Sequence, residues 1–328
     1  MPSISAVISG TGMSLPERVM TNFDLEKMVD TSDEWITTRT GIKERRVAGE
    51  GETLSTFATE AGRQAIEAAG LRPEEIDLII LATVTPDMPI PATACAIQEK
   101  LGCRNAAAFD MAAGCSGFIY AQSVAKQFLL SGRCRHVLVV GAELLTKYLD
   151  WQDRSTCVIF ADGAGAVVMS AGEPPRGLLA SAMHSDGSMV DFISMPGGGT
   201  LHPPGQDMID RRLHYIQMRG NETFKMAVRS LEDVCREVLD AAELSTEDVQ
   251  CFVPHQANLR IIKAVGQRLK IEDDRCFVNV ERYGNTSSAS IPIALHEAVE
   301  RKKIQEGDIV LMAAFGAGLT WAGSVLRW

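Results

Sequence analysis

The feature that most constrains this chain of 328 residues is that it repeats itself. The stretch RQAIEAAGLRPEEIDLII, residues 63–80, aligns without gaps with REVLDAAELSTEDVQCFV, residues 236–253, at an offset of 236 − 63 = 173 residues. The same offset carries the strand-like segment 136–142 onto 309–315, and it carries Cys115 onto Ser288. Three matches in one register indicate an internal duplication.

Each copy has the same predicted order of elements, which is helix, apolar strand, buried helix, apolar strand. In the first copy the strands are residues 76–84 and 136–142. Near-continuous apolar strands that alternate with helices predict a mostly parallel sheet covered on both faces. We therefore expect an α/β fold of two duplicated βαβαβ-type halves, residues 1–172 and 173–328, about a pseudo-twofold axis. Residues 156–170 are expected to form an antiparallel edge hairpin around a glycine turn.

A cysteine stands between glycines at the start of the buried helix of the first copy. Cys115 lies in the stretch MAAGCSGF and precedes the almost wholly apolar segment 117–130. The unpaired N–H groups and the dipole at a helix N-terminus favour a thiolate there. An arbitrary cysteine is more often a small buried hydrophobe, but flanking glycines permit close backbone approach and favour a nucleophile.

Two polar residues of the second copy are expected near this cysteine. His255 directly follows the apolar strand 249–254, and Asn285 precedes the helix that corresponds to the Cys115 helix. Ligands in such sheets bind beyond the carboxyl ends of the strands, where these loops meet. Taken singly, His255 could be a packing residue and Asn285 a turn or helix cap. Together with Cys115 they predict a catalytic site.

Five motifs in order make the chain resemble the beta-ketoacyl-[acyl-carrier-protein] synthase III family over essentially its whole length. They are DTSDEWITTRTGIKERR at 30–46, DMAAGCSGF at 110–118, VPHQANLRII at 253–262, RYGNTSSAS at 282–290 and AAFGAGLTWAG at 313–323. The resemblance implies a thiolase-like fold with α-β-α-β-α layers, and a homodimer.

The resemblance also implies a reaction, the initiating decarboxylative Claisen condensation of fatty-acid synthesis. An acyl-CoA primer would acylate Cys115, and malonyl-ACP would lose CO2 and attack the acyl-enzyme to give 3-oxoacyl-ACP. His255 and Asn285 would hydrogen-bond the malonyl thioester oxygen as the enolate forms. A second oxyanion hole would use backbone N–H groups of Cys115 and Ala317. Both thioesters are substrates, so we expect no cofactor and no metal.

Further site residues are implied by the resemblance alone. Trp35 and Arg154 would hold the adenine of CoA, and Arg39 would meet phosphate. The segment Gln256, Ala257, Asn258, Leu259 and Arg260 would bind acyl-carrier protein together with Lys225. Ile90 would shape the acyl pocket, partly across the dimer interface. Many relatives restricted to short acyl chains carry Phe there, so Ile90 predicts room for acyl groups longer than acetyl.

Composition narrows the class of protein further. A net charge of −10 argues against a general nucleic-acid binder. No apolar stretch reaches the length of a membrane span and the N-terminus lacks the pattern of a signal peptide, so a cytoplasmic location is expected. The eight cysteines and six histidines have no metal-ligand spacing.

Two alternatives remain open at this point. One is a secondary-metabolite condensing enzyme of the same subfamily, and the other is a non-catalytic scaffold that binds acyl-carrier protein. A scaffold has no need for Cys115, His255 and Asn285 together. A redox-sensing role for Cys115 is disfavoured because no cysteine lies near it in the sequence to resolve an oxidised sulfur.

Overall fold

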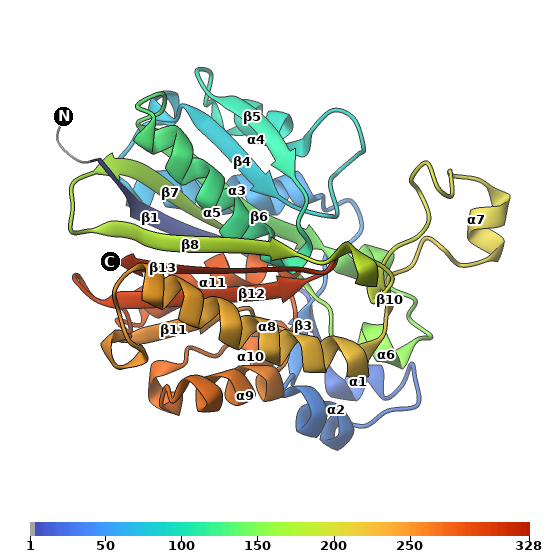
Figure 1. Cartoon of the computed structure of the whole chain (residues 1–328). Helices are drawn as coiled ribbons and strands as arrows, with labels where there is room; N and C mark the ends of the chain where they lie inside the picture. The colour runs from blue at the N-terminus through green and yellow to red at the C-terminus, as the bar shows by residue number, and fades with distance from the viewer. Residues whose placement is uncertain (1–3) are drawn as a thin grey trace.

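Two stacked sheets form the core of the protein, whose computed structural model describes residues 4–328 (Figure 1). The first sheet has the strand order β1-β7-β6-β4-β5, and the second has the order β8-β13-β12-β11. The first contains β1 (Ser5–Ser14), β4 (Leu78–Ala82), β5 (Ala107–Met111), β6 (His136–Leu144) and β7 (Asp162–Gly172). The second contains β8 (Gly177–Ser185), β11 (Cys251–Pro254), β12 (Ile309–Gly316) and β13 (Thr320–Arg327).

The strand orders show the duplication directly, because β1, β7, β6 and β4 match β8, β13, β12 and β11 in turn. The sheets are mixed rather than mostly parallel. β6, β4 and β5 run parallel to one another, as do β12 and β11, whereas β7 and β13 are antiparallel to their neighbours. A short connection returns the chain from β12 into β13, and a short connection allows only an antiparallel neighbour.

Helices cover both sheets in the order α-β-α-β-α. α5 (Gly117–Leu130) and α11 (Ser290–Glu300) share one apolar core with strands of both sheets and therefore lie between them. α3 (Leu54–Ala68) and α4 (Thr93–Leu101) pack on the outer face of the first sheet. α8 (Gly220–Ala241) and α9 (Leu259–Leu269) pack on the outer face of the second (Figure 1).

The 173-residue offset found in the sequence holds at the central elements of the structure. The 3-10 turn Gly114–Ser116 before α5 and the turn Ser287–Ala289 before α11 are 173 residues apart, and so are the first residues of β6 and β12. Gly114 and Ser287 even share a left-handed backbone, with φ of +53° and +50°. The two central helices therefore begin in the same way.

The predicted edge hairpin at residues 156–170 is wrong. The short helix α6 (Arg154–Cys157) comes first, and β7 is then one continuous strand between β1 and β6. Its glycines admit a neighbouring helix instead of making a turn. A Cβ on Gly165 would lie 2.6 Å from the backbone nitrogen of Ile293 in α11.

Smaller elements surround the carboxyl ends of the central strands. They are β2 (Val19–Thr21), α1 (Asn22–Leu25), α2 (Asp33–Thr40), β3 (Glu44–Arg46) and α10 (Val280–Tyr283). An excursion with β9 (Ile193–Ser194), α7 (Gln206–Asp210) and β10 (Gln217–Met218) projects from the body (Figure 1). Across residues 4–328, every helix is too short or too polar to cross a bilayer.

Candidate active site

Most of the residues predicted for the site line one cavity of about 550 Å³. This cavity reaches inward from α2, α6 and α8 to the start of α5 and the carboxyl end of β11. The predicted residues that line it are Trp35, Arg39, Cys115, Arg154, Lys225, His255, Ala257, Asn258, Arg260 and Asn285. Both copies of the repeat therefore contribute to one site.

Cys115 lies in the 3-10 turn that leads into α5, and tight backbone packing fixes it there. A Cβ on Gly316 would lie 2.5 Å from the backbone nitrogen of Cys115, and a Cβ on Gly114 would lie 2.8 Å from that of Ala317. Only glycines allow these two segments to approach so closely. The backbone around Ala317 thus lies beside Cys115, where the second oxyanion hole is expected.

The position equivalent to Cys115 in the second copy is Ser288, and its surroundings differ. Ser288 hydrogen-bonds Glu143 across 2.9 Å, and Glu143 is the residue equivalent to Gly316. The serine in the turn before α11 is therefore paired with a carboxylate of the first copy, whereas the cysteine in the turn before α5 is paired with a glycine of the second copy. Cys115 lines the cavity, whereas Glu143 lies in the equivalent place beside Ser288.

His255 follows β11 and is held in one orientation. Its backbone N–H donates to the carbonyl of Ala313 on β12 across 2.8 Å, and its Nδ1 lies 2.6 Å from the hydroxyl of Ser290 on α11. The Ser290 hydroxyl also accepts the backbone N–H of Gln256, so its own proton is available to Nδ1. This arrangement leaves the proton of the neutral ring on Nε2.

Asn285 is anchored through its backbone and its side-chain oxygen. Its N–H donates to Ile159 and its carbonyl accepts from Ala161, at 3.0 and 2.9 Å. The side-chain Oδ1 accepts the backbone N–H of Ser287 across 2.8 Å. The amide NH2 is therefore the end that can donate to a ligand in the cavity.

Burial sets the protonation of the two titratable groups. It raises the pKa of the Cys115 thiol to about 12, against the opposing effect of a hydrogen bond with Ser287, and the nearby Glu143 adds to the rise. It lowers the pKa of His255 to about 3. Desolvation of the Cys115 sulfur therefore acts against the thiolate that was expected at this helix N-terminus. The resting site holds a thiol and a neutral imidazole.

Glu143 is a functional candidate that the sequence did not single out, and its carboxylate contacts both halves. Its carboxylate accepts from the hydroxyl of Thr85 at 2.6 Å and from the backbone N–H of Val84 at 3.1 Å, besides Ser288. Burial raises its pKa to about 7, and these donors oppose the rise. The sequence signal that could have found Glu143 is a carboxylate near the end of the otherwise apolar strand HVLVVGAEL. Ser287 and Ser290, within NTSSAS, were also missed.

Positive charge gathers where the cavity opens. The guanidinium carbons of Arg39 and Arg154 lie 4.7 and 5.0 Å from the ring centroid of Trp35. Lys225 and Arg260 are exposed on the same rim, and Arg260 lies 5.4 Å from the ring of Phe224. An anionic ligand with a planar ring matches this rim.

The segment QANLR does not present all its side chains to a partner. Gln256 is 1% exposed and its amide is bonded to the carbonyls of Pro254 and Phe277, so direct contact with a carrier protein is not available to it. Leu259 packs against Gly41 in the core under α2. Asn258 caps α9 by accepting from the N–H of Arg260. Arg260 is the one fully exposed residue of this motif, and Ala257, Asn258 and Leu259 are half-buried.

Ile90 lies away from this cavity. Its side chain is 84% exposed in the loop before α4, and it is not among the residues that line the cavity of this chain. Among residues 4–328 there is also no cluster of three His, Cys, Asp or Glu that could hold a metal ion.

The sequence profiles of one family match both halves of the chain. The profile described as 3-Oxoacyl-[acyl-carrier-protein (ACP)] synthase III matches residues 109–187, and that of its C-terminal part matches residues 239–328. The beta-ketoacyl-[acyl-carrier-protein] synthase III of Caldanaerobacter subterraneus is 53% identical over 325 residues, which cover 99% of this chain and 98% of the relative.

Solved structures agree. The crystal structure of 3-oxoacyl-[acyl-carrier-protein] synthase III from Aquifex aeolicus is 52% identical, with a TM-score of 0.92 and coverage of 98% of this chain and 100% of that one. The priming beta-ketosynthase of the R1128 polyketide pathway is 36% identical, with a TM-score of 0.92 and coverage of 100% and 97%.

The fold and the relatives define a thiolase-like condensing enzyme, as the sequence motifs predicted. The chain belongs to the beta-ketoacyl-[acyl-carrier-protein] synthase III family. It is an acyl-transferring enzyme of the condensation that initiates fatty-acid synthesis.

Proposed function

We propose that the chain condenses an acyl-CoA primer with malonyl-ACP through an acyl group carried on Cys115. The observation that carries this proposal is the meeting of Cys115, His255 and Asn285 in one cavity, from both halves of the duplicated fold. We further propose that these halves, 1–172 and 173–328, are the two structural domains of the chain.

Acyl transfer begins from the neutral thiol. The sulfur attacks the thioester carbonyl, the carbon–sulfur bond to CoA breaks, and one proton passes in net terms from Cys115 to the departing thiolate. Backbone N–H groups of Cys115 and Ala317 stabilise the tetrahedral oxyanion. Because the resting thiol is protonated, its deprotonation accompanies the attack rather than preceding it.

The condensation step uses the other two residues. Nε2–H of His255 and the amide NH2 of Asn285 donate to the malonyl thioester oxygen while the carbon–carbon bond to CO2 breaks. The enolate attacks the acyl carbonyl and expels the Cys115 sulfur, which takes up one proton. Both donors are uncharged, so neither has to lose a proton, and neither opposes the developing negative charge as a carboxylate would.

The rim receives the carriers. Trp35 and Arg154 hold the adenine and Arg39 meets phosphate, while Lys225, Arg260 and the Ala257–Asn258 backbone face acyl-carrier protein. The guanidiniums of Arg39 and Arg154 already lie over the Trp35 ring, at 4.7 and 5.0 Å from its centroid. A stacking adenine ring therefore has to displace one of them. Ile90, exposed in a single chain, reaches the acyl pocket of a second copy in a homodimer. The reaction needs no cofactor, and a cytoplasmic location fits both substrates.

Mass spectrometry tests the nucleophile and the acyl-chain preference together. Mixing the protein with acetyl-, butyryl- and octanoyl-CoA is expected to add one acyl group on Cys115, and Cys115→Ala removes it. His255→Ala and Asn285→Ala are expected to acylate but to condense with malonyl-ACP roughly a hundred- to thousandfold more slowly. A Cys115→Ala protein that condenses at the normal rate defeats the proposal, and strict acetyl preference defeats the role given to Ile90.

A second function has one specific observation in its favour. The priming beta-ketosynthase of the R1128 polyketide pathway shares the fold over the full chain at 36% identity. A secondary-metabolite role predicts faster condensation with a polyketide carrier protein than with the acyl-carrier protein of fatty-acid synthesis, and the ratio of the two rates decides between them.

A further inference from the structure

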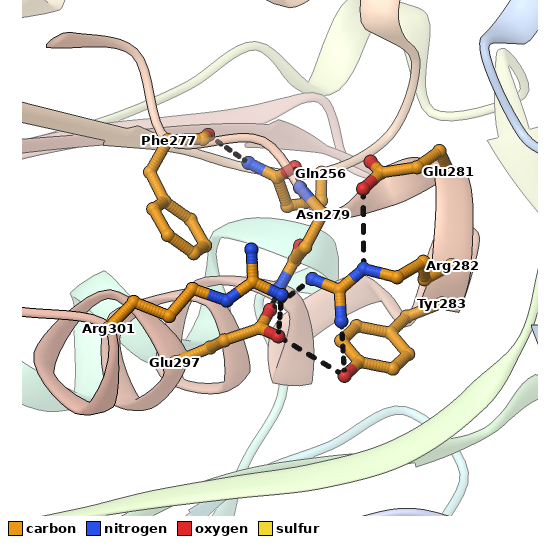
Figure 2. Close-up of polar contacts among 8 residues, drawn as sticks. All are labelled: Gln256, Phe277, Asn279, Glu281, Arg282, Tyr283, Glu297 and Arg301. Atoms are coloured by element: carbon orange, nitrogen blue, oxygen red, sulfur yellow. Dashed lines mark hydrogen bonds and ion pairs between the residues drawn. The ribbon is translucent and has the colours of Figure 1, made fainter. Parts of the chain in front are cut away.

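A buried chain of hydrogen bonds leads from the residue after His255 to a carboxylate on α11 (Figure 2). Gln256 donates its amide protons to the carbonyls of Pro254 and Phe277 at 2.8 and 3.1 Å. Its Oε1 accepts the backbone N–H of Asn279 at 3.0 Å. Both polar atoms of this side chain are thus bonded to backbone groups, and they join the loop that carries His255 to residues 277–279.

Asn279 continues the chain to Glu297. Its amide donates to Oε2 of Glu297 across 3.0 Å, and Arg282 donates to the same oxygen across 2.7 Å. Arg301 donates to the other oxygen across 2.8 Å, and the hydroxyl of Tyr283 lies 3.4 Å from it. The carboxylate is 9% exposed, so these donors replace its lost hydration (Figure 2). Burial acts to raise the pKa of Glu297, but the hydrogen bonds from Arg282 and Asn279 outweigh it and hold the pKa below its usual value.

One helix therefore holds the His255 loop at two points. Ser290 and Glu297 lie on α11 seven residues apart, which is about two turns, so both face the same side of the helix. Ser290 fixes the ring of His255, and Glu297 fixes the peptide beyond it through Asn279 and Gln256.

The same carboxylate also anchors the segment that carries Asn285. Arg282 and Tyr283 belong to α10, which ends two residues before Asn285, and both contact Glu297. Cys115 stands outside this network, because its position is set by α5 and by the close approach of Gly316.

We propose that Glu297, acting through Asn279 and Gln256 on one side and Arg282 on the other, is a positioning residue for both hydrogen-bond donors of the condensation step. This inference rests on the proposed function, and it assigns Gln256 to the interior of the enzyme rather than to the carrier-protein interface. Its consequence is that the network governs condensation and leaves acyl transfer to Cys115 nearly untouched.

The test measures the two half-reactions separately in Glu297→Gln. Acylation by acyl-CoA is followed by intact mass, and condensation is followed by mixing pre-acylated protein with malonyl-ACP. We expect acylation within about twofold of the wild type and condensation kcat lowered roughly 10- to 100-fold, with KM for malonyl-ACP nearly unchanged. Glu300→Gln, an exposed neighbour on α11, is the matched control and is expected to change neither.

Asn279→Ala keeps the test valid if Glu297→Gln does not fold. This variant removes the side-chain hydrogen bond from Asn279 to Glu297 and so separates Gln256 from the carboxylate, while Arg282 and Arg301 still neutralise Glu297. It is expected to show the same selective loss of condensation. Equal losses in both half-reactions, or no loss in either, overturn the inference. A wild-type protein that neither acylates Cys115 nor condenses overturns the proposed function instead, so the two failures are distinguishable.

Discussion

Replacing Gly316 with alanine tests whether the position of Cys115 depends on backbone contact. The added Cβ would lie 2.5 Å from the Cys115 nitrogen and 2.9 Å from its Cβ. Ordinary contacts begin at 3.4 Å, so the two segments must separate by about 3.4 − 2.5 = 0.9 Å. Neither partner is a flexible side chain, so the strain cannot be relieved by a change of rotamer.

The size of the effect follows from this displacement. A misplacement near 1 Å in a reacting group costs roughly a hundredfold in rate, or about 2.7 kcal/mol of barrier. Overpacking adds a loss of about 1–3 kcal/mol in the free energy of unfolding. Both effects should appear in one variant, since the contact that strains the fold also moves the nucleophile.

The assay is rapid-quench mass spectrometry of acyl transfer from acyl-CoA, with urea unfolding beside it. Gly187→Ala is the matched control, because a Cβ there meets nothing within 4 Å and its backbone is not left-handed. The control is expected to keep both the wild-type rate and the wild-type stability. Normal acylation by a Gly316→Ala protein of unchanged stability would refute the reasoning.

Three further predictions concern other parts of the protein. Below pH 6.5 the unfolded chain protonates His255 while the folded chain, in which burial lowers its pKa to about 3, does not. The free energy of unfolding therefore falls by up to about 2.7 kcal/mol between pH 6.5 and 4.5. In urea unfolding, the fall over this pH range should be smaller by that amount for His255→Asn. Trp35→Ala is expected to raise KM for acyl-CoA about tenfold in steady-state assays, while condensation of pre-acylated protein is unchanged. Arg45→Met removes three hydrogen bonds from the Arg45 guanidinium to buried acceptors and should lower the free energy of unfolding by at least about 3 kcal/mol in urea, against less than about 0.5 kcal/mol for the exposed Arg18→Met.

The repeat predicted the central elements well because the packing of the buried helices on the strands fixes the spacing of these elements in both copies. The start of a buried helix and the strand that packs on it cannot shift by one residue without turning apolar faces to solvent. That is why Cys115 and Ser288, or His136 and Ile309, stay in register. The meeting of Cys115, His255 and Asn285 in one cavity follows from the same constraint.

Sequence reasoning failed where a residue's surroundings, rather than its type, decide its behaviour. Gly163 and Gly165 suggested a turn, but they admit α11 against a straight strand. Gln256 follows a strand as a loop residue does, yet its amide is consumed inside the protein. The helix start at Cys115 suggested a thiolate, although desolvation keeps the thiol neutral. None of these contacts is visible before the chain is folded.

The pair Cys115 and Gly316 at the start of one central helix is replaced by the pair Ser288 and Glu143 at the start of the other, so the two pseudo-symmetric positions differ chemically. The Glu143 carboxylate occupies the place beside Ser288 that a substrate bound at the pseudo-twofold equivalent of the site would need, so the start of α11 is blocked by the chain itself. Under the proposed function, the start of one central helix carries the acyl group and the start of the other has a structural role, so each polypeptide would carry a single acyl group.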